Sequence, residues 1–397
     1  MRWQWHFGLG RELGYAFWAL TFFEAAIGAY APIWPLWIED RGASIAIVGI
    51  VLASAGIFRP LVLAPGTALI DRFNTRNLLL ACRGLSVLGL VIAALAQTWE
   101  ILLVTVLFNT IGELVFPTIH AYIADHAGEN AVHAFNMTIT IGPAGGLILT
   151  PLLSGLVIGV GGMPAAFILS AVLTLAGMAF VSRMQFESHR VAAEGEQRTT
   201  YRAAVLHQGI RSLVILHGCT ILSLSIGVAL ISNFLEVERG LSPSTIAMLS
   251  SGAAVGTVAF GLFSARFRPL RHTPVLGAAA AAALTALGFL LFGTQAALPL
   301  IGIAYVLRGG LFSAWALFLA ALGKVAPGHL RSRAFAVMEI TGGSAMSFGP
   351  IIAARLWDID PAAPLFVAAA LGLTMAGIGV IASRRPSINP PSTMAPA

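Results

Sequence analysis

Two short stretches of the chain, EDRGAS at residues 39–44 and VERGLS at residues 237–242, match each other at an offset of 198 residues. Two further pairs have nearly the same offset: AGENAVHAF (127–135) with PGHLRSRAF (327–335), and ALIDRF (68–73) with LFSARF (262–267). The three matches occur in the same order in both halves of the chain. They indicate a duplicated half, which predicts two similar helical bundles with a cavity between them.

The composition places this duplication in a membrane. Of the 397 residues, 57% are hydrophobic and only 10% are charged, and the mean hydropathy is +0.86. Soluble domains are about 25% charged. So few charges cannot cover a water-facing surface, so we expect most of the outer surface to face hydrocarbon.

Twelve apolar runs are long enough to cross a bilayer, which takes about 20 residues. They lie at approximately 13–37, 45–69, 76–96, 101–124, 134–158, 163–184, 209–235, 243–265, 273–294, 298–321, 334–357 and 362–382. The sequence therefore predicts an all-α membrane protein with two pseudo-symmetric six-helix bundles. The expected boundaries are a first bundle at 1–184, a cytoplasmic linker at 185–208, a second bundle at 209–385 and a disordered cytoplasmic tail at 386–397.

The basic residues set the orientation. Most of the 23 Lys and Arg fall on one side of the twelve runs, and only Arg41, Arg239 and Arg355 fall on the other. Positive residues stay in the cytoplasm, so we expect both termini there, in a multi-pass protein of the bacterial inner membrane. The net charge of +6 comes from short runs without interleaved aromatics, so it does not indicate a nucleic-acid partner.

A loop after the second run carries a recognisable motif. The segment APGTALIDRFNTR (64–76) resembles the loop signature of the major facilitator superfamily, G-x-L-a-D-r-x-G-r-k, with Asp71, Arg72 and Arg76 at its charged positions. The second copy, GLFSARFRP (261–269), is degenerate and has Ala265 at the acidic position. The resemblance implies that the Asp71, Arg72 and Arg76 loop is a gating latch on the cytoplasmic side.

Two other segments refine the resemblance and disagree about direction. Residues 22–61 are similar to the subgroup that holds oligosaccharide, nucleoside and phenylpropionate permeases, which take solutes up. IGPAGG (141–146) is similar to a glycine–proline motif of helix five in exporters of the superfamily. The resemblance covers the whole chain, and it implies that helices one, four, seven and ten line the central cavity.

Six charged residues lie within the apolar runs: Glu24, Glu113, Glu339, Arg59, Arg83 and Arg308. A charge at the bilayer centre costs roughly 3 kcal/mol, so such residues have partners or face water. Arg83 and Glu339 lie within two turns of the cytoplasmic end, and we expect them to reach the surface.

Glu24 is the first candidate for proton coupling. Thr21, Gly28, Ala31 and Pro35 share a helical stripe of small or polar residues with it. A buried carboxylate there could load and release a proton. The alternative is a structural ion pair with Arg59 or another basic group.

Glu113 is the second candidate. Asn109, Glu113 and His120 fall on one helical face, which suggests a substrate or proton path. Interhelical hydrogen bonding is the alternative for such residues in membranes.

Arg308 is the candidate for solute recognition. Phe312 and Trp315 share its helical face, and a cation flanked by aromatics suits an anionic or aromatic solute. Neutralisation of Glu24 or Glu113 is the alternative role. His217 is a further possible cavity residue, or else a packing residue.

The sequence has neither a phosphate-binding P-loop nor a paired Cys/His pattern, so it indicates no cofactor, no metal and no enzyme. It predicts a monomeric secondary transporter that moves a small organic solute by alternating access, coupled to protons. Symport is favoured slightly over antiport efflux of drugs or metabolites. An uncoupled facilitator and a non-transporting sensor or assembly protein are the other hypotheses.

Overall fold

The computed structural model describes residues 5–70, 73–126, 134, 136–186, 201–327 and 330–385. In these residues the chain is helical, and eleven helices are long and apolar enough to cross a membrane. A shorter apolar helix, Trp99–Gly112, begins the predicted fourth span. The predicted all-α fold with twelve spans is therefore confirmed.

The chain forms two compact units, Met1–Val191 with Gly240–Ser251, and Ala192–Arg239 with Gly252–Ala397. The division at residues 191 and 192 falls within the predicted linker, although the exact boundaries proposed from the sequence stay predictions. Residues 240–251 belong to the first unit, where Ser244 Oγ donates a hydrogen bond of 2.6 Å to the Gly155 carbonyl.

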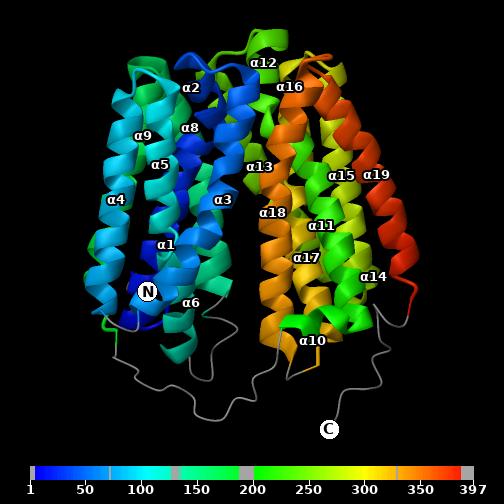
Figure 1. The fold of residues 1–397 in the computed structure, drawn as a ribbon, viewed down its shortest axis with the longest axis horizontal. Coiled ribbons are helices and arrows are strands. Elements are labelled where there is room, and N and C mark those ends of the chain that lie inside the picture. Colours follow the sequence, from blue (N-terminus) through cyan, green and yellow to red (C-terminus); the bar gives the residue numbers. More distant parts are fainter. Residues whose placement is uncertain are drawn as a thin grey trace. The chain divides into compact units, whose positions relative to one another are not determined.

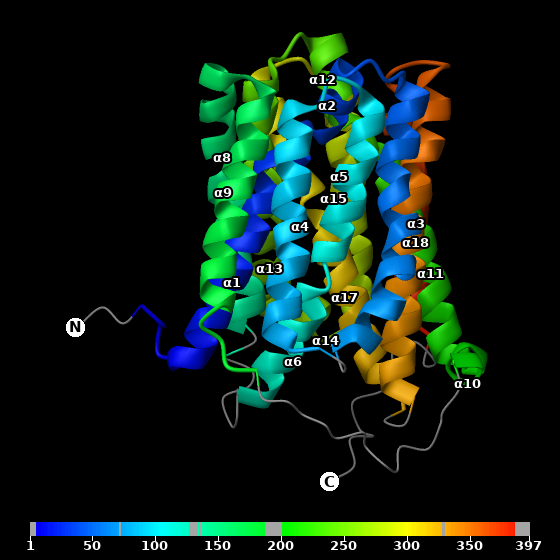
Figure 2. The same ribbon diagram turned by 60° about the vertical axis from the view of Figure 1, so that its left-hand side comes forward.

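The first unit consists of helices that run alongside one another (Figure 1). Their bounds are α1 Arg11–Tyr30, η1 Ala31–Ile33, α2 Trp34–Asp40, α3 Ile45–Ile70, α4 Thr75–Leu95, α5 Trp99–Gly112, α6 Val115–His126, η3 Asn136–Ile141, α8 Gly142–Gly161 and α9 Met163–Val181. Both views show α4 beside α5 (Figures 1 and 2). The helix α1 packs against α8 and α9, and α9 packs in turn against α4.

The second unit repeats this plan. Its helices are α10 Tyr201–Leu206, α11 Gln208–Ala229, α12 Ile231–Arg239, α14 Arg268–His272, α15 Pro274–Thr294, α16 Leu298–Arg308, α17 Gly310–Val325, α18 Arg331–Trp357 and α19 Ala363–Ala382. The helix α13, Pro243–Arg266, begins in the first unit and belongs to the second from Gly252 onward. The helix α11 packs against α18 and α19, as α1 packs against α8 and α9 in the first unit.

The Arg-Gly dipeptide that occurs in both units makes equivalent contacts in each. Arg41 Nη1 donates to the Ala96 carbonyl at the end of α4, and the guanidinium of Arg239 donates to the Gly293 and Gln295 carbonyls at the end of α15. Both arginines thus satisfy carbonyls that a helix end leaves without partners.

The glycine after each arginine ends the helix. Gly42 has a φ of 90° and Gly240 a φ of 63°, a left-handed conformation that glycine adopts without strain. The serine that closes each repeat then starts the next helix. Ser44 Oγ accepts from Ile47 N at 3.4 Å, and Ser242 Oγ accepts from Thr245 N at 3.3 Å.

Aromatic residues gather where α1 begins and α9 ends. Trp18 stacks on Phe180 with ring centroids 6.2 Å apart, and its Nε1 donates to the Trp5 carbonyl. Tyr15 packs on Trp5 in the same group. This arrangement is typical of an aromatic belt at a membrane surface.

Candidate charged site

Four of the predicted spans, each expected as one continuous run, are interrupted. The interruptions are residues 31–33 between α1 and α2, Glu113 and Leu114 between α5 and α6, Leu230 between α11 and α12, and Gly309 between α16 and α17. Spans one and seven are interrupted at corresponding places in the two halves, and so are spans four and ten. The repeat thus extends to the positions of the breaks.

Prolines explain the breaks in the first unit. Pro35 follows Ala31 by four residues, and Pro117 follows Glu113 by four, so neither carbonyl can receive the usual helical N–H. The Ala31 carbonyl bonds instead to Trp34 N, and the Glu113 carbonyl bonds to Phe116 N.

Close packing accompanies the break in span ten. A Cβ on Gly309 would collide with the Ala253 carbonyl of α13, and a Cβ on Gly310 would collide with the Ala281 carbonyl of α15. Thr257 Oγ1 lies 2.9 Å from the Gly309 carbonyl and can donate to it. The glycines therefore let α13 and α15 approach the backbone at the break.

Glu113 lies at the break of span four and forms an ion pair with Arg59. Arg59 Nε is 3.3 Å from Glu113 Oε2, without the geometry of a hydrogen bond. The side chains of Arg59 and Glu113 are 50% and 38% exposed, respectively. The sequence suggests Arg59 as an ion-pair partner for Glu24, whereas in the structure Arg59 pairs with Glu113.

Arg83 corrects a prediction. It was expected to reach the cytoplasmic surface, but it is only 6% exposed and lies inside the first unit. Its guanidinium stacks on Phe23, with Cζ 4.0 Å from the ring centroid, and on Phe116 at 4.9 Å. The stretch CRG around it gave no signal of burial, because the aromatic rings that hold it come from distant parts of the chain.

Glu24 belongs to the same charged cluster. Coulombic interactions connect Arg83 to both Glu24 and Glu113. Thr21 and Gly28 of the predicted stripe face α8, where Gly28 packs near Leu147. The first unit therefore gathers two carboxylates and two arginines, which we call the charged cluster: Glu24, Arg59, Arg83 and Glu113.

Arg308, the last residue of α16, lies beside the corresponding break in the second unit. It is partly buried, its Nε has no hydrogen-bond partner among the described residues, and it interacts electrostatically with Tyr305. Phe312 is 54% exposed and sits beyond the break. Arg308 therefore has an unsatisfied donor at a helix end.

Trp315 lies with His217 in a separate aromatic group. His217 is fully buried, and its ring meets Trp315 edge-on at 4.9 Å and Phe318 at 5.4 Å. Neither ring nitrogen has a hydrogen-bond partner in the described part of the chain. Trp315 Nε1 donates to Glu339 Oε1 at 3.1 Å.

The remaining predicted site residues are Asn109, His120, Arg76, Asp71 and Arg72. Asn109 and His120 are partly exposed and lie on opposite sides of the break, so the face that the sequence predicted is not one continuous helix. Arg76 is exposed on the first turn of α4. Asp71 and Arg72 lie outside the described residues. The described residues contain no group of three or more His, Cys, Asp or Glu placed to hold a metal ion.

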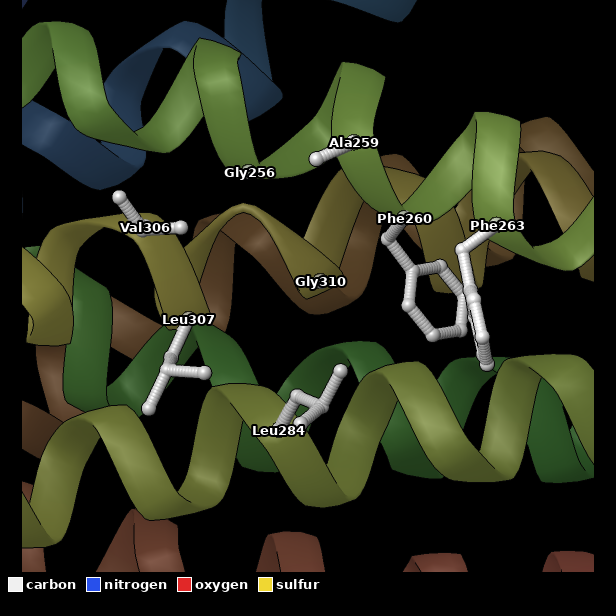
Figure 3. A pocket seen from close by; sticks show the side chains of 8 residues that line it. All are labelled: Gly256, Ala259, Phe260, Phe263, Leu284, Val306, Leu307 and Gly310. Atoms are coloured by element: carbon white, nitrogen blue, oxygen red, sulfur yellow. The ribbon is translucent and has the colours of Figure 1, made fainter.

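An open apolar pocket lies in the second unit (Figure 3). It is lined by Gly256, Ala259, Phe260, Phe263, Leu284, Val306, Leu307 and Gly310. This lining offers no polar side chain to a solute, so we place the candidate site at the charged groups instead.

Comparison with known proteins identifies the family. The sequence profile of the Major Facilitator Superfamily matches residues 16–350. The chain belongs to the Major Facilitator Superfamily. Comparison with curated proteins finds no match.

Solved structures of superfamily transporters share the fold. The nucleoside transporter NupG has a TM-score of 0.71 at 16% identity, over 94% of this chain and 98% of its own. A POT family transporter in complex with a thioalcohol-conjugated peptide has a TM-score of 0.74 at 12% identity, over 94% of this chain and 96% of its own. The human organic anion transporter MFSD10 has a TM-score of 0.66 at 14% identity, over 93% of this chain and 98% of its own.

Gly142 and Gly146 of the segment IGPAGG (141–146) have a packing role. A Cβ on Gly142 would collide with Thr21, and a Cβ on Gly146 would lie 2.8 Å from the Thr21 carbonyl. These glycines thus let α8 pack closely on α1. Close helix packing accounts for these glycines, whatever the direction of transport.

Proposed function

We propose that this superfamily member is a secondary active transporter that carries a small organic solute by alternating access, coupled to protons, with symport as the direction. It acts in the bacterial inner membrane with both termini in the cytoplasm, as a monomer. The observation that carries this proposal is the set of paired helix breaks. In transporters built from repeats, interrupted helices at corresponding positions mark the binding site.

The two charged residues at the breaks suit different roles. Glu113 lies at the break of span four and Arg308 at the break of span ten. A carboxylate can bind and release a proton, whereas arginine stays charged and binds carboxylate or phosphate with parallel hydrogen bonds. We assign proton coupling to Glu24 and Glu113. We assign solute recognition to Arg308, Asn109, Glu113, Phe312 and Trp315, with Arg59, His120 and His217 as secondary candidates.

A thermal-shift screen with uridine, lactose, phenylpropionate and dialanine tests the solute class. The nucleoside, peptide and organic anion named for the structural relatives motivate three of these probes. A compound that stabilises the protein selectively is then radiolabelled and offered to proteoliposomes with a pH gradient. We expect the wild type to accumulate it.

Glu24→Gln tests the coupling. Glutamine keeps the shape of the side chain but cannot carry a proton, so the variant should exchange solute across the membrane without accumulating it. Glu100→Gln is the matched control, because Glu100 is exposed in the first turn of α5, outside the charged cluster. Undiminished gradient-driven accumulation by Glu24→Gln would show that the coupling assignment is wrong.

A further inference from the structure

Arg83 is a buried cation that the proposed mechanism does not yet use. It sits on α4, outside the four interrupted spans, and is 6% exposed. Its Nε and Nη2 atoms are buried and have no hydrogen-bond partner among the described residues. Arginine does not lose its proton inside a protein, so this charge must be balanced by charges nearby.

Arg83 stacks on two aromatic residues that are close in the sequence to Glu24 and Glu113. Phe23, which stacks on its guanidinium at 4.0 Å, precedes Glu24 in α1, and Phe116, at 4.9 Å, follows Glu113 by one turn. The Phe23 ring is itself held from α9, because a Cβ on Gly177 would lie 2.6 Å from it. The two rings thus hold the guanidinium in place within the electrostatic reach of both acidic residues.

The packing of Gly112 holds the stem of Arg83 as well. A Cβ on Gly112 would lie 3.6 Å from Arg83 Cδ and would collide with Ser86 Oγ. Gly112 is the last residue of α5, directly before the break at Glu113. The stem of Arg83 therefore lies near the break.

The ionisable groups around Arg83 form a short inventory. Glu24, Glu113, Tyr30 and Cys82 interact with it electrostatically, and Arg59 pairs with Glu113 at the more exposed edge. Arg83 can neutralise one carboxylate, not two. If Arg83 neutralises Glu24, Glu113 still has the half-exposed Arg59 as a partner, and water weakens that pair.

We propose that Arg83 is the positioning residue of proton coupling, a fixed cation that keeps one of Glu24 and Glu113 ionised so that the pair exchanges a single proton. The proton bonds to a carboxylate oxygen from water on one side of the membrane and returns to water on the other side. No other bond is made or broken. This inference rests on the proposed coupling role of the two glutamates.

Infrared spectroscopy of the purified protein in nanodiscs tests this directly and needs no solute. The C=O band of protonated carboxyl groups is followed from about pH 5 to about pH 9. We expect a band that changes with pH in the wild type and is altered in Glu24→Gln and in Glu113→Gln. In Arg83→Gln the pH-dependent part should be lost, because no buried cation keeps a carboxylate ionised.

Three variants make the test decisive. Arg183→Gln is the matched control, since Arg183 is an exposed arginine just after α9 in the same unit, and it should leave the band as in the wild type. Arg83→Lys keeps the charge and should restore the pH-dependent band. If Arg83→Gln does not fold, the double variant Arg83→Gln/Glu24→Gln removes one charge of each sign and provides a folded background in which Glu113 alone is followed.

The outcomes separate the two proposals. If Arg83→Gln shows the same pH-dependent band as the wild type, the proposed role of Arg83 is wrong, even if Glu24→Gln abolishes accumulation. A wild-type protein without any pH-dependent carboxyl band overturns the inference as well. Loss of the band in Arg83→Gln with undiminished accumulation by Glu24→Gln supports the role of Arg83 in setting the charge and contradicts the coupling assignment alone.

Discussion

At the scale of single residues, burial decides what an arginine does. Arg76 and Arg83 lie two turns apart on α4, yet Arg76 is exposed and Arg83 is 6% exposed between two aromatic rings. Arg59 differs again, since it pairs with Glu113 while half of its side chain stays exposed. The same residue type therefore serves topology, charge balance and a weak ion pair.

Arg59→Gln should change stability little. Its ion pair with Glu113 is partly exposed and lacks hydrogen-bond geometry, so screening limits the loss to less than about 1 kcal/mol. Arg83→Gln removes a buried partner of two carboxylates and should cost more, about 3 kcal/mol. Unfolding followed by intrinsic fluorescence in one detergent compares the two, and equal losses would contradict this reasoning.

At the scale of elements, the repeated RG dipeptide explains why its residues recur. The arginine bonds to carbonyls at the end of a neighbouring helix, and the glycine ends its own helix in a left-handed conformation. Because the two turns make equivalent contacts, both need the same residues. This explains why the short motif recurs where the surrounding sequence differs. The sequence match is thus a physical constraint at two equivalent turns.

Arg41→Gln and Arg239→Gln should each destabilise the protein. Each variant leaves helix-end carbonyls without a charged donor, which costs about 1–2 kcal/mol. Arg355→Gln is the control, because Arg355 is the third arginine predicted on that side and is exposed. Melting temperatures in detergent report the difference. A control that loses as much stability as the two variants would argue against the capping role.

Gly309→Ala should be severely disruptive for a change of one methyl group. Its Cβ would meet the backbone of α13, which cannot move aside as a side chain could, so we expect a loss of about 1–3 kcal/mol. Gly377→Ala places a methyl group where nothing lies within 4 Å and should leave stability unchanged or raise it by up to about 1 kcal/mol. Thermal unfolding of both variants measures the contrast.

At the scale of the whole molecule, the charge distribution predicts topology. Gln97 and Ala296 are exposed between helices on the side with few arginines, and His272 is the exposed last residue of α14 on the basic side. In a variant with Cys82 and Cys219 replaced by alanine, Gln97→Cys and Ala296→Cys should react with an impermeant maleimide in intact cells. His272→Cys should react only after the membrane is opened, and the reverse pattern would refute the predicted orientation.

The sequence by itself determined the membrane fold, the number of spans, the repeat and the list of charges within the membrane. These follow from composition, periodicity and spacing, which act locally along the chain. It predicted four continuous spans that the structure interrupts, although the prolines at positions 35 and 117 were visible signals for two of the breaks.

Only the tertiary structure decided which charges meet. It is Glu113, and not Glu24, that pairs with Arg59. Arg83 of α4 is buried because Phe23 of α1 and Phe116 of α6 converge on it. Such convergence depends on how helices pack, and no local pattern encodes it. The physical reason is that a buried charge is stabilised by its partners in space, which the order of residues along one helix does not specify.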